Sequence, residues 1–412
     1  MPSIVPMTPA RAGSVKVGAR ELFVVAMLVV VALLFLGTGA ARPGSSDAAA
    51  VAGTQGTVAA SGTLPDSLTS TEFAALSSEL SEPDGYFDSD NLVSNEASYL
   101  QVLGVMRESG TTGGVFVGVG PDQGFSYIAA VQPRMAFMMD IRRDNLLLHL
   151  LYKAAFHEAG SRVEFLALFF GRPAPNVPDA WADSSVAGVA AWVDANPPTA
   201  ASRAAATRRL LNRIGSFGMD LGQEDLATIR RFHDGYVDRG LDIRFESLGR
   251  PSRSEYPTYR QMIMERDDTG EPAGYLASER SFRVVRELQL RNLVVPVVGD
   301  LAGEGAVRAT GRWIAARDAQ VSLFYASNVE FYLAREGRLG AFGRNLDALP
   351  RHERSLLVRS IFRGNRAAFE NPARPGYISA QSAAPLDSVV HALTTLGVAG
   401  YPELVAYGRL GR

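Results

Sequence analysis

The chain has 412 residues, of which 47% are hydrophobic and 20% charged, and its 41 basic and 43 acidic residues give a formal net charge of −2. This composition excludes an intrinsically disordered chain, which would be poorer in apolar residues. A membrane protein with several spans would have several long uncharged runs, and this sequence has a single one. The lack of a basic excess argues against a nucleic-acid partner. The chain has no cysteine, which excludes disulfides, thiolate metal sites and cysteine nucleophiles.

An apolar run near the N-terminus predicts one transmembrane helix. Residues 22–41 carry no charge, and their length is close to the ~20 residues that a helix needs to cross a bilayer. Basic residues precede the run, so the positive-inside rule keeps residues 1–21 in the cytoplasm and predicts that the remainder is exported. Small residues at 38–41 also allow cleavage as a signal peptide, in which case the protein would be secreted rather than membrane-anchored. In both cases the main domain is expected to be extracytoplasmic.

Residues 42–84 are predicted to connect this segment to the folded domain. Residues 42–66 are rich in Ala, Ser, Gly and Thr, a composition that cannot bury a core and is typical of a flexible tether. A short helix is expected next, with Ser70 as its N-cap. The folded domain is therefore expected to occupy residues 85–412.

The segment from residue 113 to 155 carries the strongest functional pattern. An apolar run at 115–119 ends in glycines, a helix is expected over 125–131, and a second apolar run ends at Asp140. Asp140 follows Gly120 by 20 residues, the spacing at which nucleotide-binding βαβ units place an acid against the ribose hydroxyls. The pattern therefore predicts a nucleoside site. The alternative is a βαβ turn whose glycines serve only tight backbone geometry.

Two later apolar runs predict a third and a fourth strand. Residues 293–298 are followed by Asp300, and residues 320–325 are followed by the polar segment 327–330. Ligands of open α/β sheets bind beyond the carboxyl ends of the strands. We therefore expect the glycine turn, Asp140, Asp300 and segment 327–330 to meet at one edge of the sheet.

These stretches resemble the class I S-adenosylmethionine-dependent methyltransferases, and in particular an uncharacterised membrane-anchored or exported group with that fold. The resemblance covers residues 86–170 and 290–335, and it is carried by GGVFVGVGPDQGFSYIAA, MAFMMDIRRDNLLLHLLYKAAF and VVGDLAG. It implies an α/β fold with a doubly wound, mostly parallel sheet. It also implies S-adenosylmethionine as the cofactor.

The resemblance implies a role for each residue of the pattern. Gly118, Gly120 and Gly124 would flank the methionine moiety. Asp140 would bind the ribose hydroxyls, and Asp300 would hold the adenine amino group. The further residues expected to contact the cofactor are Pro121, Asp122, Gln123, Ile141, Arg142, Leu301 and Ser327.

The catalytic residues are expected just after the fourth strand. Glu330 is the candidate general base, and Tyr325 or Asn328 would position the acceptor. The chain departs from the family pattern twice. Phe116 stands where the family has an acid two positions before its first glycine, and segment 327–330 replaces the Asn/Asp-Pro-Pro loop. The first departure affects the methionine amino group, and the second leaves the substrate undefined.

Two further features each allow two interpretations. A helix expected over residues 145–158, with Asp144 as its N-cap, places His149, Lys153 and His157 on one face, and we interpret this face as solvated or cleft-lining rather than as a metal site. Asn95 and Glu96 either fold over the nucleoside pocket or cap a helix at residues 97–108. No metal is predicted.

Residues 159–290 are predicted as a helical insertion that caps the pocket or binds a partner. Helices are expected over residues 162–170, 203–214, 225–240 and 278–290. In the remaining chain, helices are expected over residues 304–317, 353–363 and 386–396, and a strand over 376–380.

The sequence therefore predicts a nucleoside-cofactor-binding protein that resembles an S-adenosylmethionine-dependent methyltransferase and acts on a small molecule or protein rather than a nucleic acid. The alternative is a non-catalytic exported binding or scaffolding domain on the same fold, because a fold alone does not define a function.

Overall fold

The computed structural model describes residues 62–89, 91–250, 253–362 and 378–410. The predicted cytoplasmic N-terminus, the predicted transmembrane segment at 22–41 and tether residues 42–61 lie outside these ranges. None of the helices in these ranges combines the length and the hydrophobicity that a membrane span requires.

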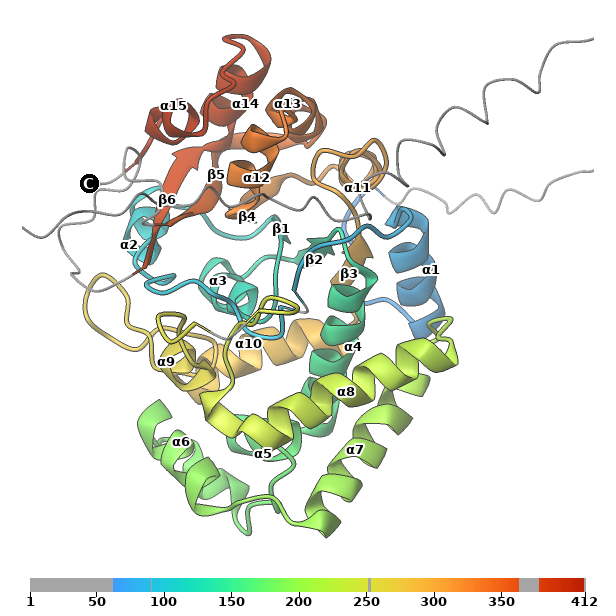
Figure 1. Ribbon diagram of the computed structural model, residues 1–412. Coiled ribbons are helices and arrows are strands. Elements are labelled where there is room, and N and C mark those ends of the chain that lie inside the picture. Colours follow the sequence, from blue (N-terminus) through green and yellow to red (C-terminus); the bar gives the residue numbers. More distant parts are fainter. Residues whose placement is uncertain (1–61, 90, 251–252, 363–377, 411–412) are drawn as a thin grey trace, which may run out of the picture. The chain divides into compact units, whose positions relative to one another are not determined.

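A six-stranded sheet forms the centre of the described domain (Figure 1). Its strands lie in the order β3-β2-β1-β4-β5-β6; the first five are parallel, and β6 is antiparallel to β5. The strands are β1 (Val115–Gly118), β2 (Met135–Asp140), β3 (Val294–Val298), β4 (Val321–Ser327), β5 (Arg351–Phe362) and β6 (Ser379–Pro385). The prediction of a mostly parallel α/β sheet is confirmed.

The strand order reverses between β1 and β4. The chain moves outward from β1 to β2 and β3, and then returns to add β4 and β5 on the other side of β1. Strands β1 to β4 are buried along almost their whole length, which explains why they read as continuous apolar runs rather than as alternating patterns.

Helices cover the sheet in two groups that pack separately. Helices α3, α4 and α10 belong to the connections between β1, β2 and β3, and α10 packs on both α3 and α4. On the other side of the strands in Figure 1, α13 packs on α11 and α14. The helices outside the insertion are α1 (Ser70–Leu80), α2 (Leu103–Glu108), α3 (Gln123–Val131), α4 (Arg143–Glu158), α10 (Glu279–Leu290), α11 (Ala306–Ala315), α12 (Val329–Arg335), α13 (Leu339–Asp347), α14 (Leu386–Thr394) and α15 (Tyr401–Ala406).

The residues between α4 and α10 are mostly helical and pack against α4. Their elements are α5 (Arg162–Phe169), the short 3₁₀ helices η1 (Pro178–Trp181) and η2 (Gly240–Asp242), α6 (Val186–Ala195), α7 (Ala200–Gly215), α8 (Gln223–Arg239) and α9 (Tyr259–Ile263). Aromatic rings form the contact with the sheet domain: Phe125 of α3 packs edge-on against Phe156 of α4 and against Tyr275, each with ring centroids 5.5 Å apart. The insertion therefore shares the main hydrophobic core.

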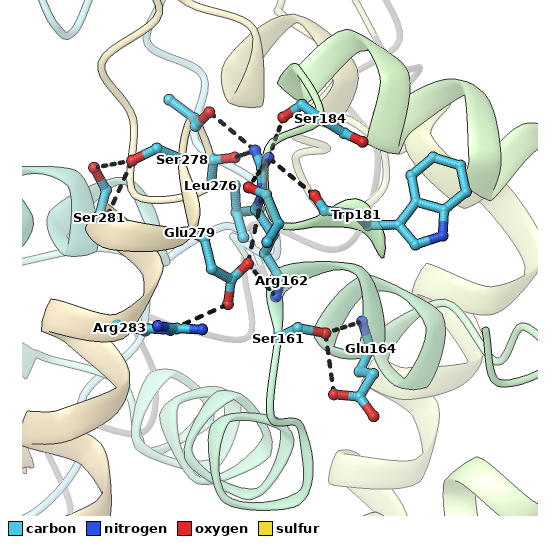
Figure 2. Close-up of polar contacts among 12 residues, drawn as sticks. Ser161, Arg162, Glu164, Trp181, Ser184, Leu276, Ser278, Glu279, Ser281 and Arg283 are labelled. Atoms are coloured by element: carbon cyan, nitrogen blue, oxygen red, sulfur yellow. Dashed lines mark hydrogen bonds and ion pairs between the residues drawn. The ribbon is translucent and has the colours of Figure 1, made fainter. Parts of the chain in front are cut away.

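Arg162 ties the ends of the insertion together, as Figure 2 shows. Its buried guanidinium donates hydrogen bonds to the carbonyls of Leu276 and Ala277 before α10, at 3.0 and 2.9 Å. It also donates to the carbonyls of residues 181, 182 and 184, at the end of η1 and just after it, and it lies 3.7 Å from the carboxylate of Glu279. One side chain thus joins two segments about 100 residues apart in the chain.

The helix predicted over residues 353–363 is wrong. This segment belongs to β5, which pairs with β4 on one side and β6 on the other. Arg359 in this strand is fully buried and forms an ion pair with Glu330, a contact with a residue distant in the chain that the local sequence does not show.

Three predicted helix starts are also corrected. Thr69, not Ser70, caps α1, with a capping box to Glu72. Asp144 lies in the first turn of α4 and is not its N-cap, which is Arg142. The helix expected over 97–108 is α-helical only from Leu103, so Asn95 and Glu96 do not cap it.

Candidate functional site

A cavity opens at the carboxyl ends of β1 to β4, where the strand order reverses. Its internal space is about 170 Å³, and Tyr86, which is 75% exposed, lies at its rim. Sequence-predicted residues from all four strand ends line it together: Gly120, Asp140, Ile141, Arg142, Asp300, Leu301, Ser327 and Asn328. Because crevices at such a reversal bind the ligands of open α/β sheets, this cavity is the candidate site.

The glycine turn after β1 reaches the cavity at Val119 and Gly120. Gly120 has a φ of +86°, which favours glycine. His149 of α4 supports the turn, because its Nε2 lies 2.9 Å from the carbonyl oxygen of Gly120. Burial lowers the pKa of His149 to about 4, with the Gly120 contact opposing this shift. The imidazole is therefore neutral near pH 7, and Nε2 carries the proton that the carbonyl accepts.

The other two glycines of the turn serve packing. A Cβ on Gly118 would lie 2.4 Å from the ring of Phe116, and a Cβ on Gly124 would lie 2.9 Å from the methyl group of Met138. The described residues that line the cavity do not include Gly118, Pro121 or Gly124, which the resemblance placed against the cofactor. The close packing of α3 on β2 therefore explains Gly124 as well as a ligand would.

Asp140 is held by a neighbouring arginine. Oδ1 of Asp140 accepts hydrogen bonds from the backbone N–H and Nε of Arg142, both at 3.0 Å, and Oδ2 accepts one from Nη2 at 2.9 Å. Arg142 also donates to the carbonyl of Ser89, 2.5 Å away, and so fastens segment 85–89 over the cavity. A carboxylate has about four acceptor positions, so Oδ2 retains one for a ligand.

Asp300 is held in a similar way after β3. Its Oδ2 accepts a hydrogen bond from Nη2 of Arg338 at 2.5 Å, and its Oδ1 accepts the N–H of Ala302. Glu82 receives the N–H groups of Asp300 and Ala306, so an internal carboxylate occupies the N-terminus of α11. Asp140 and Asp300 thus both line the cavity, and each forms an ion pair with an arginine.

Ser327 and Asn328 form the wall of the cavity after β4. Ser327 has a φ of +52°, a left-handed conformation that is unfavourable for serine and is often found at functional sites. Its hydroxyl donates to the carboxylate of Glu96, which also accepts the hydroxyl proton of Tyr325. Burial raises the pKa of Glu96, and the hydrogen bond from Ser327 opposes this shift. Tyr325 is therefore buried behind the cavity wall, where it shares the carboxylate of Glu96 with Ser327.

Asp122 and Gln123 are neighbours in the chain that face different parts of the protein. Gln123 donates to the hydroxyls of Ser94 and Tyr325 and lines a small pocket beside the cavity. Asp122 accepts the hydroxyl of Tyr275, 2.9 Å away, and belongs to the interface with the insertion. Burial raises the pKa of Asp122 to about 6, with the Tyr275 hydrogen bond opposing.

Glu330 has no access to the cavity. Its carboxylate is fully buried, with one oxygen 2.6 Å from Nε of the equally buried Arg359. Burial raises the pKa of Glu330, and the positive charge of Arg359 opposes this shift. We therefore assign Glu330 to the packing of α12 on β5 rather than to proton transfer from a substrate.

Sequence reasoning missed several residues that complete the cavity. Phe87 and Tyr332 contact each other edge-to-face, with ring centroids 5.3 Å apart, and both line it. Arg338 and Glu336 come from the segment after α12. These residues follow no strand and carry no motif spacing, so only the three-dimensional path of residues 85–89, of α12 and of the residues after α12 could identify them.

The histidine face of α4 is not solvated. His149 and Lys153 are both buried, and Lys153 donates to the carbonyl of Gln289 at 2.7 Å. Among the described residues, no group of three or more His, Cys, Asp or Glu side chains could hold a metal ion.

A protein family described as "Domain of unknown function (DUF7790)" matches residues 91–205 and 227–394. The chain belongs to this family. The DUF7790 match includes all six strands and most of the cavity, and it omits residues 206–226, where α7 ends and α8 begins. None of the curated proteins compared with the chain matches it.

Proposed function

We propose that the protein binds a nucleoside cofactor in this cavity and is an S-adenosylmethionine-dependent methyltransferase whose substrate is not a nucleic acid. One observation carries the proposal. The ends of β1, β2, β3 and β4 bring Gly120, Asp140, Asp300 and Ser327 to one cavity at the reversal of the strand order. The doubly wound, methyltransferase-like form of the sheet is part of the same proposal.

The residues fit the nucleoside part of S-adenosylmethionine better than its methionine part. The free acceptor position of Asp140 is suited to a ribose hydroxyl, and Asp300 is suited to an adenine amino group. Phe116 is fully buried in β1, so no acid stands at the position that would hold the methionine amino group. The cofactor itself would supply the reactive methyl group, and the chain would bind and orient it.

The size of the cavity sets a further requirement. Its internal space, about 170 Å³, is below the ~300 Å³ typical of small-molecule sites. A bound nucleoside would therefore extend past the rim at Tyr86 toward solvent.

The proposal is tested by calorimetry of the full-length chain with S-adenosylmethionine, its demethylated product S-adenosylhomocysteine, and NAD. We expect heat from the first two and a loss of at least about tenfold in affinity for Asp140→Asn, because one carboxylate oxygen that accepts hydrogen bonds becomes an NH2 donor. Asp318→Asn is the matched control, since Asp318 is exposed and precedes the amino end of β4. Flat titrations with all three compounds would reject a nucleoside cofactor.

One observation favours the alternative, a non-catalytic binding or scaffolding domain. Arg142 and Arg338 already engage both acids, so both ion pairs could serve only to hold the segments around the cavity. In that case Asp140→Asn would lower the stability of the protein while every titration stayed flat.

A further inference from the structure

A second, smaller pocket adjoins the cavity across a shared wall. Gly120, Ser327 and Asn328 line both spaces. The smaller space is about 40 Å³, enough for a single functional group of a ligand rather than for a whole nucleoside. A second ligand bound in this pocket would lie next to a cofactor bound in the cavity.

Gln123 lines this pocket and carries an unpaired, buried side-chain acceptor. The side chain is 3% exposed, and its Nε2 donates to Oγ of Ser94 at 2.9 Å and to the hydroxyl oxygen of Tyr325 at 3.2 Å. Tyr325 gives its own proton to Glu96, so toward Gln123 it can only accept. This arrangement fixes the amide orientation and leaves Oε1 of Gln123 without a partner among the described residues.

Ser327 adds a second acceptor. Its hydroxyl proton is committed to the carboxylate of Glu96, which leaves the oxygen lone pairs free to accept. A buried unpaired acceptor is unfavourable, so Oε1 of Gln123 is suited to a ligand that donates a hydrogen bond, and the partly buried hydroxyl oxygen of Ser327 can accept a second one.

The lining of the pocket is uncharged, in contrast to the cavity with its two ion pairs. The described residues around it carry only amide, hydroxyl and aromatic side chains besides Gly120: Asn91, Ser94, Asn95 and Asn328 beside Gln123 and Ser327, with the rings of Phe87, Phe245 and Tyr332. Amides and hydroxyls bind hydroxyl groups, and aromatic faces pack on the C–H faces of sugar rings. A charged ligand would find no opposite charge at this wall.

We propose that this pocket is the subsite of the second ligand, an uncharged small molecule of the sugar or polyol class. One of its hydroxymethyl or ring hydroxyl groups donates to Oε1 of Gln123 and lies against Ser327. This inference rests on the proposed function and deepens it, because it names the class of molecule that the cofactor-binding protein would act on.

The test uses saturation-transfer NMR of the full-length chain with methyl α-D-glucopyranoside, methyl β-D-galactopyranoside and myo-inositol. At least one neutral probe is expected to bind, and Gln123→Leu is expected to weaken it about tenfold or more, because the hydrogen bond to Oε1 is lost. Gln320→Leu is the matched control, since Gln320 is exposed just before β4.

Asn95→Asp is a second variant, because Asn95 is partly exposed and the change adds a charge without removing volume. It is expected to weaken the neutral probe as well. The proposal is overturned if no neutral probe binds, if Gln123→Leu and Asn95→Asp bind as well as the unaltered chain, or if glucuronate or glucosamine binds more tightly than the neutral probes.

The two proposals fail in different ways. Binding of a neutral probe with flat nucleoside titrations would retain the subsite and reject the cofactor. Nucleoside binding without any neutral probe would retain the proposed function and reject the sugar or polyol class.

Discussion

His149 makes the glycine turn sensitive to pH, because its imidazole is buried in the neutral form against the Gly120 carbonyl. Burial lowers its pKa from 6.5 to about 4, so the unfolded chain takes up this proton before the folded chain does. The stability that the neutral form contributes is complete above pH 6.5 and is lost as the pH falls toward 4.

The change His149→Gln isolates this effect, since a glutamine amide can still donate to Gly120 but does not titrate. We expect the advantage of the unaltered chain in unfolding free energy to shrink by about 2 kcal/mol between pH 7 and pH 5. Urea unfolding at several pH values measures it. His157 and Asp122 titrate in both proteins and cancel in the difference. A difference that does not change with pH would mean that His149 has the same pKa in the folded and the unfolded chain, so that burial does not shift it.

Glu330 and Arg359 are expected to act on stability and not on ligand binding. Removing one member of a fully buried ion pair leaves the other charge unpaired, so Glu330→Gln is expected to cost about 3–5 kcal/mol of unfolding free energy. The double variant Glu330→Gln with Arg359→Met should cost less than the sum of the two single changes. If Glu330→Gln kept full stability but abolished ligand binding, the carboxylate would have the catalytic role first expected of it.

At the scale of single elements, the strands that could be predicted from the sequence are those that are buried on both faces of the sheet. Strands β1 to β4 are short apolar runs that end in, or directly before, glycine, an acid or another polar residue, so their positions and their polar ends followed from the pattern. Strand β5 could not be predicted in this way, because its buried Arg359 forms an ion pair with Glu330, 29 positions earlier in the chain. A contact over this distance leaves no trace in the local spacing of apolar residues. For the same reason Asp140 and Asp300 were predictable at the site, whereas Phe87, Arg338 and the orientation of Gln123 were not.

The insertion depends on Arg162 for its attachment to α10. Arg162→Met removes the side chain that donates to five backbone carbonyls, so we expect a loss of about 3 kcal/mol or more. Arg283→Met is the matched control, because Arg283 also lies 3.7 Å from Glu279 but is 67% exposed, and it should cost less than about 1 kcal/mol. Chemical denaturation of both variants compares them. Equal losses would show that the charge on Glu279, and not the carbonyl contacts, holds the segment.

At the scale of the whole molecule, the insertion and the site belong to one hydrophobic core. Phe125 follows the glycine turn directly and packs on Tyr275, whose hydroxyl holds Asp122 within that turn. The insertion is therefore not a separate unit, because it packs on α3, the helix that directly follows the glycine turn at the cavity. Changes in the insertion should reach the site through these contacts even where they touch no ligand.

The location of the folded domain decides which ligands it can meet, and the lack of cysteine makes this location measurable. Single-cysteine variants Ser14→Cys and Ser254→Cys place one thiol before the apolar run and one at an exposed position of the domain. If the positive-inside rule holds, a membrane-impermeant maleimide added to intact cells should label residue 254 and not residue 14 unless the cells are lysed. A domain exposed in this way would be separated from cytosolic S-adenosylmethionine, which would favour the non-catalytic alternative or another nucleoside. Labelling of residue 254 only after lysis would reverse the predicted orientation and remove that conflict with a methyltransferase.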